Sequence, residues 1–512
     1  MDEPPATPLD KSLVRRAGFA ATTVSLAVLW IASSLSESVA FPPTALAGRI
    51  IRSTPGDVAT FFIEAFGHWA LRLLSIGAFI AALVFGSLIL VWTANEREVR
   101  PERAAMILVV VAGIASAIQP GPAMGAGPVI VALLVAGGAY VLVARLLTNV
   151  VAEPVEPDLG RREAMRLGFG GAIALALSGG VVGWLIRKTR GPDRNVALVA
   201  AQNPAPNPTA GDFPKIAGLS PEVTSPARHY VVDINLVPPT VEAEGWTLPV
   251  SGEVDNPFEL NFGSLQERFE VVEDYSVLTC ISNEVGGPLI GHSKWGGVRL
   301  ADVLEEAGVR DGAVDVIFRA ADGYSDSIPL EIAMDPRVLL AVSQNGEPLT
   351  QSHGFPCRVR VPPIYGMKNV KWITSIEVVD RDYKGYWMQR GWSDKAIIKT
   401  ESRIDVAGRS GSATAGEETW IAGVAWAGVR GVDKVEVTTD GGETWSEAEL
   451  KDPVSEVSWR LWAYRWTPEK EGRVTVGCRA TDGDGVTQTK ETAAPHPSGA
   501  SGYHLVEVDV TG

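Results

Sequence analysis

Long apolar runs that are almost free of charge fill the first 190 residues of the chain. They lie near 17–37, 70–93, 104–119, 127–147 and 169–187. Each run is long enough, or nearly so, to cross a hydrocarbon core of ~30 Å. The run at 104–119 is short enough to be a buried core helix instead, and a cleavable signal peptide would explain at most the first run. The pattern predicts a transmembrane helical domain over residues 1–190 with about five spans.

Basic residues between these runs indicate the orientation. Lys11, Arg15 and Arg16 precede the first run, Arg97, Arg100 and Arg103 follow the second, and Arg145, Arg161, Arg162 and Arg166 follow the fourth. Because cytoplasmic loops are enriched in Lys and Arg, the amino terminus is expected in the cytoplasm. An odd number of spans then places everything after residue 190 outside. Arg187, Lys188, Arg190 and Arg194 do not fit this pattern, because they would lie on the outer side.

Two further features of the membrane part bear on its role. The segment "GRREAMRLGFGGAIALALSGG" resembles an internal twin-arginine export signal, although Arg161 and Arg162 could equally be cytoplasmic anchors. His68 is the only histidine before residue 200, which excludes a bis-histidine haem within one chain. This part is therefore expected to be an anchor or a docking surface for a redox partner.

The pattern changes after residue 190. Residues 191–228 contain "NPAPNPTAGDFP", have no periodicity and read as a semi-extended linker. Over 229–400 short strands alternate with turns and a few helices, among them "VRLADVLEEAG", which predicts an α+β domain. Over 401–512 short strands are joined by turns such as Asp440-Gly441-Gly442, which predicts an immunoglobulin-like β-sandwich.

Charge and cysteine content narrow the function. The net charge of −15 argues against nucleic acid as a partner. Cys280, Cys357 and Cys478 show no CxxC spacing, so neither a zinc knuckle nor a disulfide framework is predicted. A lone cysteine is usually a small buried hydrophobe, and on its own Cys280 would be read that way.

Three separated motifs change that interpretation. They are "LTCISNEVGG…KWGGVRLADVLEEAG", "NGEPLTQSHGFPCRVRVPPIYGMKNVKW" and "RDYKG". In order and spacing they resemble the molybdopterin domain of the sulfite oxidase family, and the tryptophan-rich sandwich resembles that family's dimerisation domain. The resemblance covers about 229–512. The membrane part lies outside it and resembles an extension seen on some bacterial oxidoreductases of the family.

The resemblance implies a molybdenum–molybdopterin cofactor with one pyranopterin, and it implies roles for particular residues. Cys280 matches the cysteine whose thiolate binds molybdenum, a soft ligand suited to that metal. His353 and Arg358 match positions that hold the pterin phosphate. Tyr383 matches the active-site tyrosine, with Arg381 beside it. Other cofactor-contacting positions are Val232, Asp233, Ile234 and Asn235 on the first strand, Asn283 after the cysteine, Asp322 in an acidic turn, and Asn369, Val370 and Lys371 in "KNVKW".

The sequence therefore predicts a membrane-anchored molybdenum oxidoreductase that transfers an oxygen atom on a small substrate outside the cytoplasm. Its electron partner would be an external cytochrome or quinone-linked carrier, and a homodimer is compatible with the sandwich. Sulfite is not expected, because Asp233 and Glu284 lie where sulfite-oxidising members carry arginines, whereas a neutral or cationic S-oxide or N-oxide would fit. The alternatives are a sulfite dehydrogenase and a non-catalytic, membrane-tethered binding or assembly protein.

Overall fold

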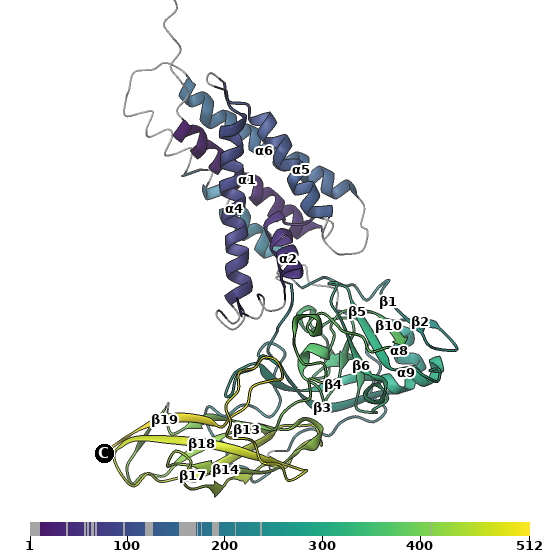
Figure 1. Cartoon of the computed structure of the whole chain (residues 1–512), viewed down its shortest axis with the longest axis vertical. Coiled ribbons are helices and arrows are strands. Elements are labelled where there is room, and N and C mark those ends of the chain that lie inside the picture. The colour runs from purple at the N-terminus through teal and green to yellow at the C-terminus, as the bar shows by residue number, and fades with distance from the viewer. Residues whose placement is uncertain are drawn as a thin grey trace, which may run out of the picture. The chain divides into compact units, whose positions relative to one another are not determined.

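The structure is a computed structural model, shown in Figure 1. It describes residues 11–36, 39–55, 58, 61–62, 66, 69–95, 98–117, 126–152, 170–171, 173–175, 177–186, 194–209, 211–235, 238–409 and 411–512. The chain forms two compact units, one of residues 1–191 with 234–240 and one of residues 192–233 with 241–512. His68, Arg97, the paired Arg161 and Arg162, Arg166, Arg187, Lys188 and Arg190 lie outside the described residues.

The first unit is helical. Its described helices are α1 (Lys11–Leu35), α2 (Pro42–Ser53), α4 (Trp69–Thr93), α5 (Pro101–Ala117) and α6 (Ala126–Ala152). Three stretches are long and apolar enough to cross a membrane: Lys11–Leu35, Arg72–Thr93 and Ala126–Thr148. The helix α5 and the apolar helix at Ile173–Ile186 are shorter. The expectation of about five spans is thus supported for three of them.

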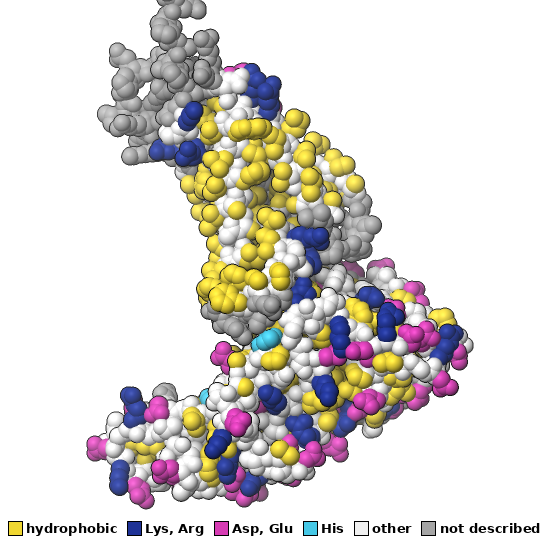
Figure 2. All heavy atoms as spheres, viewed as in Figure 1, with side chains coloured by type: hydrophobic (Ala, Val, Ile, Leu, Met, Phe, Trp, Pro, Cys, Tyr) yellow, Lys and Arg dark blue, Asp and Glu magenta, His cyan; other side chains and the backbone are white. Residues whose placement is uncertain are grey.

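Small residues bring the helices of this unit close together. A Cβ atom on Gly18 would lie 2.9 Å from the Cα atom of Ser87, so α1 and α4 approach at backbone distance. The Tyr140 hydroxyl on α6 donates to the carbonyl of Gly86 on α4 at 2.9 Å. Figure 2 shows hydrophobic side chains covering the visible face of these helices. An apolar outer surface of this kind suits a lipid environment.

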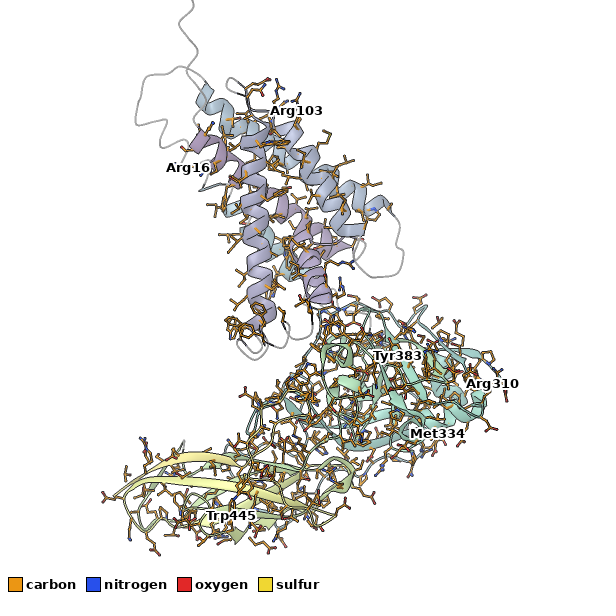
Figure 3. The ribbon with its side chains drawn as sticks, viewed as in Figure 1. Arg16, Arg103, Arg310, Met334, Tyr383 and Trp445 are labelled. Atoms are coloured by element: carbon orange, nitrogen blue, oxygen red, sulfur yellow. The ribbon has the colours of Figure 1, made fainter. Side chains whose placement is uncertain are left out.

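Several arginines of α1, α5 and α6 lie at the same end of this unit, whereas Arg72 lies at the start of α4, at the other end of that helix from Ser87. Figure 3 places Arg16 and Arg103 together there. The Ser87 hydroxyl near the end of α4 donates to the Arg15 carbonyl at 2.7 Å, and Arg145 on α6 pairs with Glu102 at the start of α5. The described basic residues that the sequence assigns to the cytoplasmic side, such as Arg16, Arg103 and Arg145, are therefore found at one end of these helices.

The α+β part of the second unit contains two five-stranded sheets. The first has the order β2 (Phe258–Asn261), β1 (Thr247–Gly252), β10 (Ile373–Val379), β5 (Asp315–Ala320), β6 (Ser325–Pro329), with β1 and β10 parallel. The second has the order β3 (Val271–Thr279), β4 (Ile290–Arg299), β7 (Leu339–Gln344), β8 (Glu347–Pro348), with β9 (Arg358–Arg360) also paired to β7. The helical elements are α8 (Phe262–Arg268), α9 (Leu300–Ala307), α10 (Leu330–Ala333), η1 (Gln351–His353), η2 (Gly366–Lys368) and η3 (Met388–Arg390).

The predicted amphipathic helix is α9, and its end follows from the sequence. Gly308 takes a left-handed conformation with φ of 68° and its N–H bonds to the carbonyls of Leu304 and Glu305. Glycine is favoured at this position because it has no Cβ atom. The helix buries Leu300, Val303 and Leu304.

The C-terminal part is a sandwich of two sheets, as the strand spacing predicts. One sheet contains β11 (Glu401–Ala407), β13 (Thr419–Trp426), β17 (Arg460–Trp466) and β16 (Glu449–Leu450). The other contains β12 (Ser412–Thr414), β19 (His504–Thr511), β18 (Gly472–Asp482), β14 (Val432–Thr438) and β15 (Ser446–Glu447), with η4 (Gly428–Arg430) before β14. Trp462, Ile421, Val435 and Cys478 lie fully buried in its core. The turn at 440–442 joins the antiparallel strands β14 and β15, which confirms the predicted hairpin.

The segment predicted as a linker is held against the α+β domain by hydrogen bonds along its described length. We call its described residues between 194 and 228 the strap. The Gln202 N–H donates to the Val271 carbonyl at 3.0 Å, Asn203 forms a bridge with Val272, and the Thr224 N–H donates to the His292 carbonyl at 2.7 Å. Because β3 is the edge strand of its sheet, the strap covers hydrogen-bonding groups that would otherwise be exposed.

Candidate functional site

Cys280 directly follows β3 and is held by a tight loop. Its side chain is 8% exposed, its N–H donates to the Leu289 carbonyl at 2.9 Å, and its Sγ atom lies 3.0 Å from the Ser282 hydroxyl. Asn283 closes the loop, because its Oδ1 atom accepts from the Leu289 N–H at 2.8 Å. Burial raises the pKa of the Cys280 thiol, and the hydrogen bonds from Ser282 and Ile281 oppose this only in part. A bound metal cation would reverse that balance and favour the thiolate.

Two tyrosines lie close to Cys280. Burial raises the pKa of Tyr230 and of Tyr365, and a thiolate at Cys280 adds to both effects. A Cβ atom on Gly366 would clash with the Tyr230 hydroxyl and lie 3.2 Å from the Thr279 carbonyl, which places this hydroxyl beside the end of β3. Neither tyrosine was assigned a role from the sequence.

Two buried arginines stand on β9. Arg358 is 3% exposed and Arg360 is 1% exposed, and their guanidinium carbons lie 5.3 and 5.9 Å from the ring centroid of Trp295. Burial lowers the pKa of Arg358 to about 10 and that of Arg360 to about 9. Sequence reasoning found Arg358 and missed Arg360, although a spacing of two residues on a strand places both on one face.

A third cation comes from the segment after η2. The Lys371 ammonium pairs with Asp233, donates to the Ser352 carbonyl at 3.1 Å and lies 4.4 Å from the Trp372 ring centroid. Asn369 braces the arginines, since its Oδ1 atom accepts from Arg360 at 2.6 Å and its carbonyl accepts from Arg358 at 3.0 Å. Lys371 is 14% exposed at its side chain, so its charge acts in a poorly hydrated setting.

The histidines of the site are neutral at pH 7. Burial lowers the pKa of His353 to about 4 and that of His229 to about 3. His353 bonds through Nε2 to the Pro226 carbonyl of the strap at 2.9 Å, and its ring packs edge-on against His229 at 5.3 Å. The positive charge of the cluster therefore comes from Lys371, Arg358 and Arg360.

The cluster fits an anionic cofactor. Of the buried N–H groups that have no hydrogen-bond partner among the described residues, three belong to the Cys280 loop and to β9: Nδ2 of Asn283, Nε of Arg358 and Nε of Arg360. Leaving such donors unpaired is costly, and an oxygen-rich anion such as a pterin phosphate would pair them. A buried thiol and unpaired donors together suit a molybdenum–pterin group.

Some of the other predicted positions contact this cluster, and others do not. The Val232 carbonyl accepts from Lys371 at 3.4 Å. Burial raises the pKa of the Asp322 carboxyl. The nearby charge of Asp233 also raises this pKa, and that of Lys371 lowers it. Val370 is 1% exposed and its carbonyl accepts from the Val359 N–H on β9. Ile234 and Asn235 are grouped with the helical unit.

Tyr383 and Arg381 lie on the first sheet's side of the domain. The Tyr383 hydroxyl shares a hydrogen bond of 2.7 Å with Ser325, and its N–H donates to Asp315 at 2.8 Å. Arg381 is 63% exposed and its described ion pair is with Asp380 at 3.8 Å. "RDYKG" begins two residues after the end of β10 in the first sheet, whereas Cys280 follows β3 of the second sheet. Figure 3 labels Tyr383. None of the described hydrogen bonds of Tyr383 reaches the residues around Cys280, and its catalytic role stays a prediction.

Comparison with known proteins identifies the two domains of the second unit. Residues 235–387 match the family described as the oxidoreductase molybdopterin binding domain, and residues 395–496 match the Mo-co oxidoreductase dimerisation domain. Mitochondrial sulfite oxidase of Mus musculus is 37% identical over 238 residues, which cover 40% of this chain and 43% of that one. Sulfite oxidase of Gallus gallus is 30% identical over 357 residues, which cover 57% of this chain and 76% of that one.

The fold itself is shared with a solved structure. The sulfane dehydrogenase SoxCD from Paracoccus pantotrophus superposes with a TM-score of 0.50 at 22% identity, over 57% of this chain and 82% of that one. The second unit is thus a molybdopterin oxidoreductase fold with its dimerisation domain, and the chain belongs to the sulfite oxidase family. The resemblance drawn from the three motifs is confirmed, and with it the molybdenum–molybdopterin cofactor. The match to the Mus musculus protein spans less than half of that protein's length.

Proposed function

We propose that this protein is a membrane-anchored molybdenum oxidoreductase that transfers an oxygen atom to or from a small neutral or cationic substrate. The observation that carries the proposal is the buried Cys280 thiol in the same domain as a cluster of cations with unpaired donors. The bound cofactor would supply two-electron redox chemistry and an exchangeable oxygen. Cys280 would bind the metal, while Arg358, Arg360 and Lys371 would hold the pterin phosphate.

The charges near Cys280 support a substrate that is not a dianion. In the described structure, the groups that favour the Cys280 thiolate are Ser282 and the Ile281 backbone rather than a cationic side chain. Arg403, which reaches the same loop at the Gly287 carbonyl, is engaged by Asp405 and by the Ser220 hydroxyl. Asp233 does not act as a free carboxylate, because Lys371 neutralises it. Glu284, which is exposed in this loop, and the pairing of the nearby cations therefore disfavour a dianionic substrate.

Steady-state kinetics test the substrate. We expect molybdenum-loaded protein to reduce at least one neutral sulfoxide or N-oxide with a kcat/KM more than ~10²-fold above that for sulfite, because one missing charge at ~4 Å is worth about 4 kcal/mol at an effective dielectric of ~20. Molybdenum content is measured on the same sample. Efficient sulfite oxidation, near ~10⁶ M⁻¹s⁻¹, would instead establish a sulfite dehydrogenase, the activity named in the relatives.

The partners follow from the same proposal. Electrons would pass to or from an external cytochrome or quinone-linked carrier, and the dimerisation domain at residues 395–496 supports a homodimer.

We infer that the catalytic unit faces away from the cytoplasm. The arginines of α1 and α5 that lie at one end of the helical unit, together with the odd number of candidate spans among the described residues, three, support this orientation.

Protease protection tests the orientation. A tag placed after Gly512 should be cleaved by protease added outside cells whose cytoplasmic membrane is intact. A tag placed before Lys11 should be protected until detergent dissolves that membrane. The amino-terminal tag is the internal control for membrane integrity. Cleavage of the amino-terminal tag alone would place the catalytic unit in the cytoplasm.

A further inference from the structure

The loop that carries Cys280 contains two adjacent glycines that lie against the sandwich. Gly286 takes a left-handed conformation with φ of 76°, and a Cβ atom on it would clash with the Nε2 atom of His504 on β19. A Cβ atom on Gly287 would lie 2.5 Å from the Oδ1 atom of Asn283. The loop therefore has no room for a side chain at either position, and its main chain packs directly against the sandwich.

Arg403 on β11 connects this loop with the sandwich and with the strap. Its Nη1 atom donates to the Gly287 carbonyl at 3.0 Å, Nε donates to Asp405 at 2.7 Å, and Nη2 donates to the Ser220 hydroxyl of the strap at 3.0 Å. The Ser220 N–H also donates to the second carboxylate oxygen of Asp405 at 3.1 Å. The side chain of Arg403 is 13% exposed and that of Asp405 is 9% exposed, so this ion pair is poorly hydrated. We call Arg403, Asp405, Ser220 and His504 the clasp.

His504 is a neutral member of the clasp. Its Nδ1 atom accepts from the Ile404 N–H at 2.9 Å, which places the ring proton on Nε2, the atom next to Gly286. Burial lowers the pKa of His504, Arg403 lowers it further, and Asp405 opposes both effects. The ring therefore packs against the loop without charge at pH 7, and the charge-assisted hydrogen bond to the loop comes from Arg403.

Short hydrogen bonds connect the residue that the clasp holds with Cys280. The Gly287 N–H donates to the Glu284 carbonyl at 2.8 Å, and the Asn283 N–H donates to the Cys280 carbonyl at 3.0 Å. The other end of the loop is fixed by β3, which ends at Thr279. We expect a loop connected in this way to move as one piece, so that a shift at Gly287 also moves the Cys280 sulfur.

We propose that Arg403 is a positioning residue, which holds the loop from the sandwich so that the Cys280 sulfur is oriented for binding the molybdenum. The inference rests on the proposed function and deepens it, because it gives the dimerisation domain a part in the metal site. Arg403 acts through the Gly287 carbonyl and is otherwise engaged by Asp405 and Ser220. If the clasp only stabilised the boundary between the two domains, its loss would leave the properties of the bound metal unchanged.

The test compares full-length, molybdenum-loaded wild type with Arg403→Met. Hydrogen exchange of the Gly287 and Leu289 amides should become more than ~10-fold faster, because the loop loses a charge-assisted hydrogen bond and opens more often. The electron paramagnetic resonance spectrum of the half-reduced protein should change, since it depends on how the thiolate sulfur is oriented at the metal. We expect kcat for oxide reduction to fall about 10²-fold, the loss that a displacement of ~1 Å can produce, with KM and molybdenum content unchanged.

Arg460→Met is the matched control. Arg460 on β17 belongs to the same sandwich, is 16% exposed at its side chain, and donates to the Lys451 and Val432 carbonyls at 2.9 and 3.0 Å. This variant removes similar hydrogen bonds that do not involve the Cys280 loop. It should lose stability without changing the exchange of the loop amides, the spectrum or kcat.

A second variant keeps the test decisive if Arg403→Met does not fold. Arg403→Met leaves the buried Asp405 carboxylate without its ion-pair partner, which destabilises the protein. Arg403→Met combined with Asp405→Asn removes that charge, and the same changes in loop exchange, spectrum and kcat are expected. A wild-type spectrum together with wild-type kcat in the folded variant would overturn the proposal, even if the protein is less stable. Absence of molybdenum from the wild type, which is measured first, would overturn the proposed function instead.

Discussion

Serine in place of Cys280 is expected to reduce turnover to background while leaving the fold intact. The hydroxyl of serine remains protonated at neutral pH and is a hard donor, so it does not replace the thiolate as a ligand of molybdenum. The loop itself should survive the change. Its hydrogen bonds run from the Cys280 N–H to the Leu289 carbonyl and from the Leu289 N–H to the Oδ1 atom of Asn283, and the Sγ atom takes part in neither. Turnover, molybdenum content and thermal unfolding are measured on the same preparations.

Cys478→Ser is the matched control for this variant. It makes the same chemical change at another buried cysteine, in the core of the sandwich, where Ser402 is a hydrogen-bonding neighbour of the sulfur. The control should keep its molybdenum and its turnover. Wild-type turnover in Cys280→Ser would show that the thiolate is not the metal ligand.

Loss of the Lys371 charge is expected to abolish retention of the cofactor. In Lys371→Met the Asp233 and Asp322 carboxyl groups would face each other without a cation. Leaving one partner of a buried ion pair uncompensated costs about 3–5 kcal/mol. The pterin phosphate would also lose a cation that could hold it, so molybdenum content should fall more than ~10-fold. Elemental analysis of purified protein and the temperature of unfolding are the measurements.

Two matched variants separate stability from cofactor binding. Lys294→Met removes a similar lysine, 18% exposed and paired with Glu273 between β3 and β4, and should lose stability without losing molybdenum. Asp233→Asn added to Lys371→Met should restore stability but not the cofactor, because the repulsion is relieved while the cation is still absent. Full molybdenum occupancy in Lys371→Met would contradict the role of Lys371 as a phosphate ligand.

Short sequence patterns predicted the turns and helix ends whose conformation depends on neighbouring residues. The end of α9 at Gly308 and the hairpin at 440–442 were both readable, because a left-handed glycine and an Asp-Gly turn each act within a few residues. The linker was only half predicted. Its extended conformation follows from its prolines, but its pairing with β3 depends on Val271 and Val272, some 70 residues further along the chain, and no local pattern encodes that contact.

The site shows the same division. The motif resemblance predicted roles for Cys280, Arg358 and Lys371; the structure shows that Cys280 and Arg358 are buried and that Lys371 pairs with Asp233, and their roles stay predictions. Arg403 could not be found this way, because nothing around it in the sequence indicates that its guanidinium group reaches the Gly287 carbonyl. The ion pair between Lys371 and Asp233 was not predicted either, because these residues are far apart in the chain. Since Lys371 neutralises Asp233, this carboxylate alone does not exclude an anionic substrate.

The strap is structurally part of the oxidoreductase domain, so this domain begins before residue 229. Its contacts with Val271, Val272 and His292 bind it to the oxidoreductase domain, and it supplies the Pro226 carbonyl that receives the hydrogen bond from His353. A gene fusion that joined this domain to different membrane helices at residue 229 would leave the edge of β3 uncovered and would remove the hydrogen-bond partner of His353. A fusion that preserves these contacts would have to join the two parts before residue 194, so that the strap stays with the domain it binds.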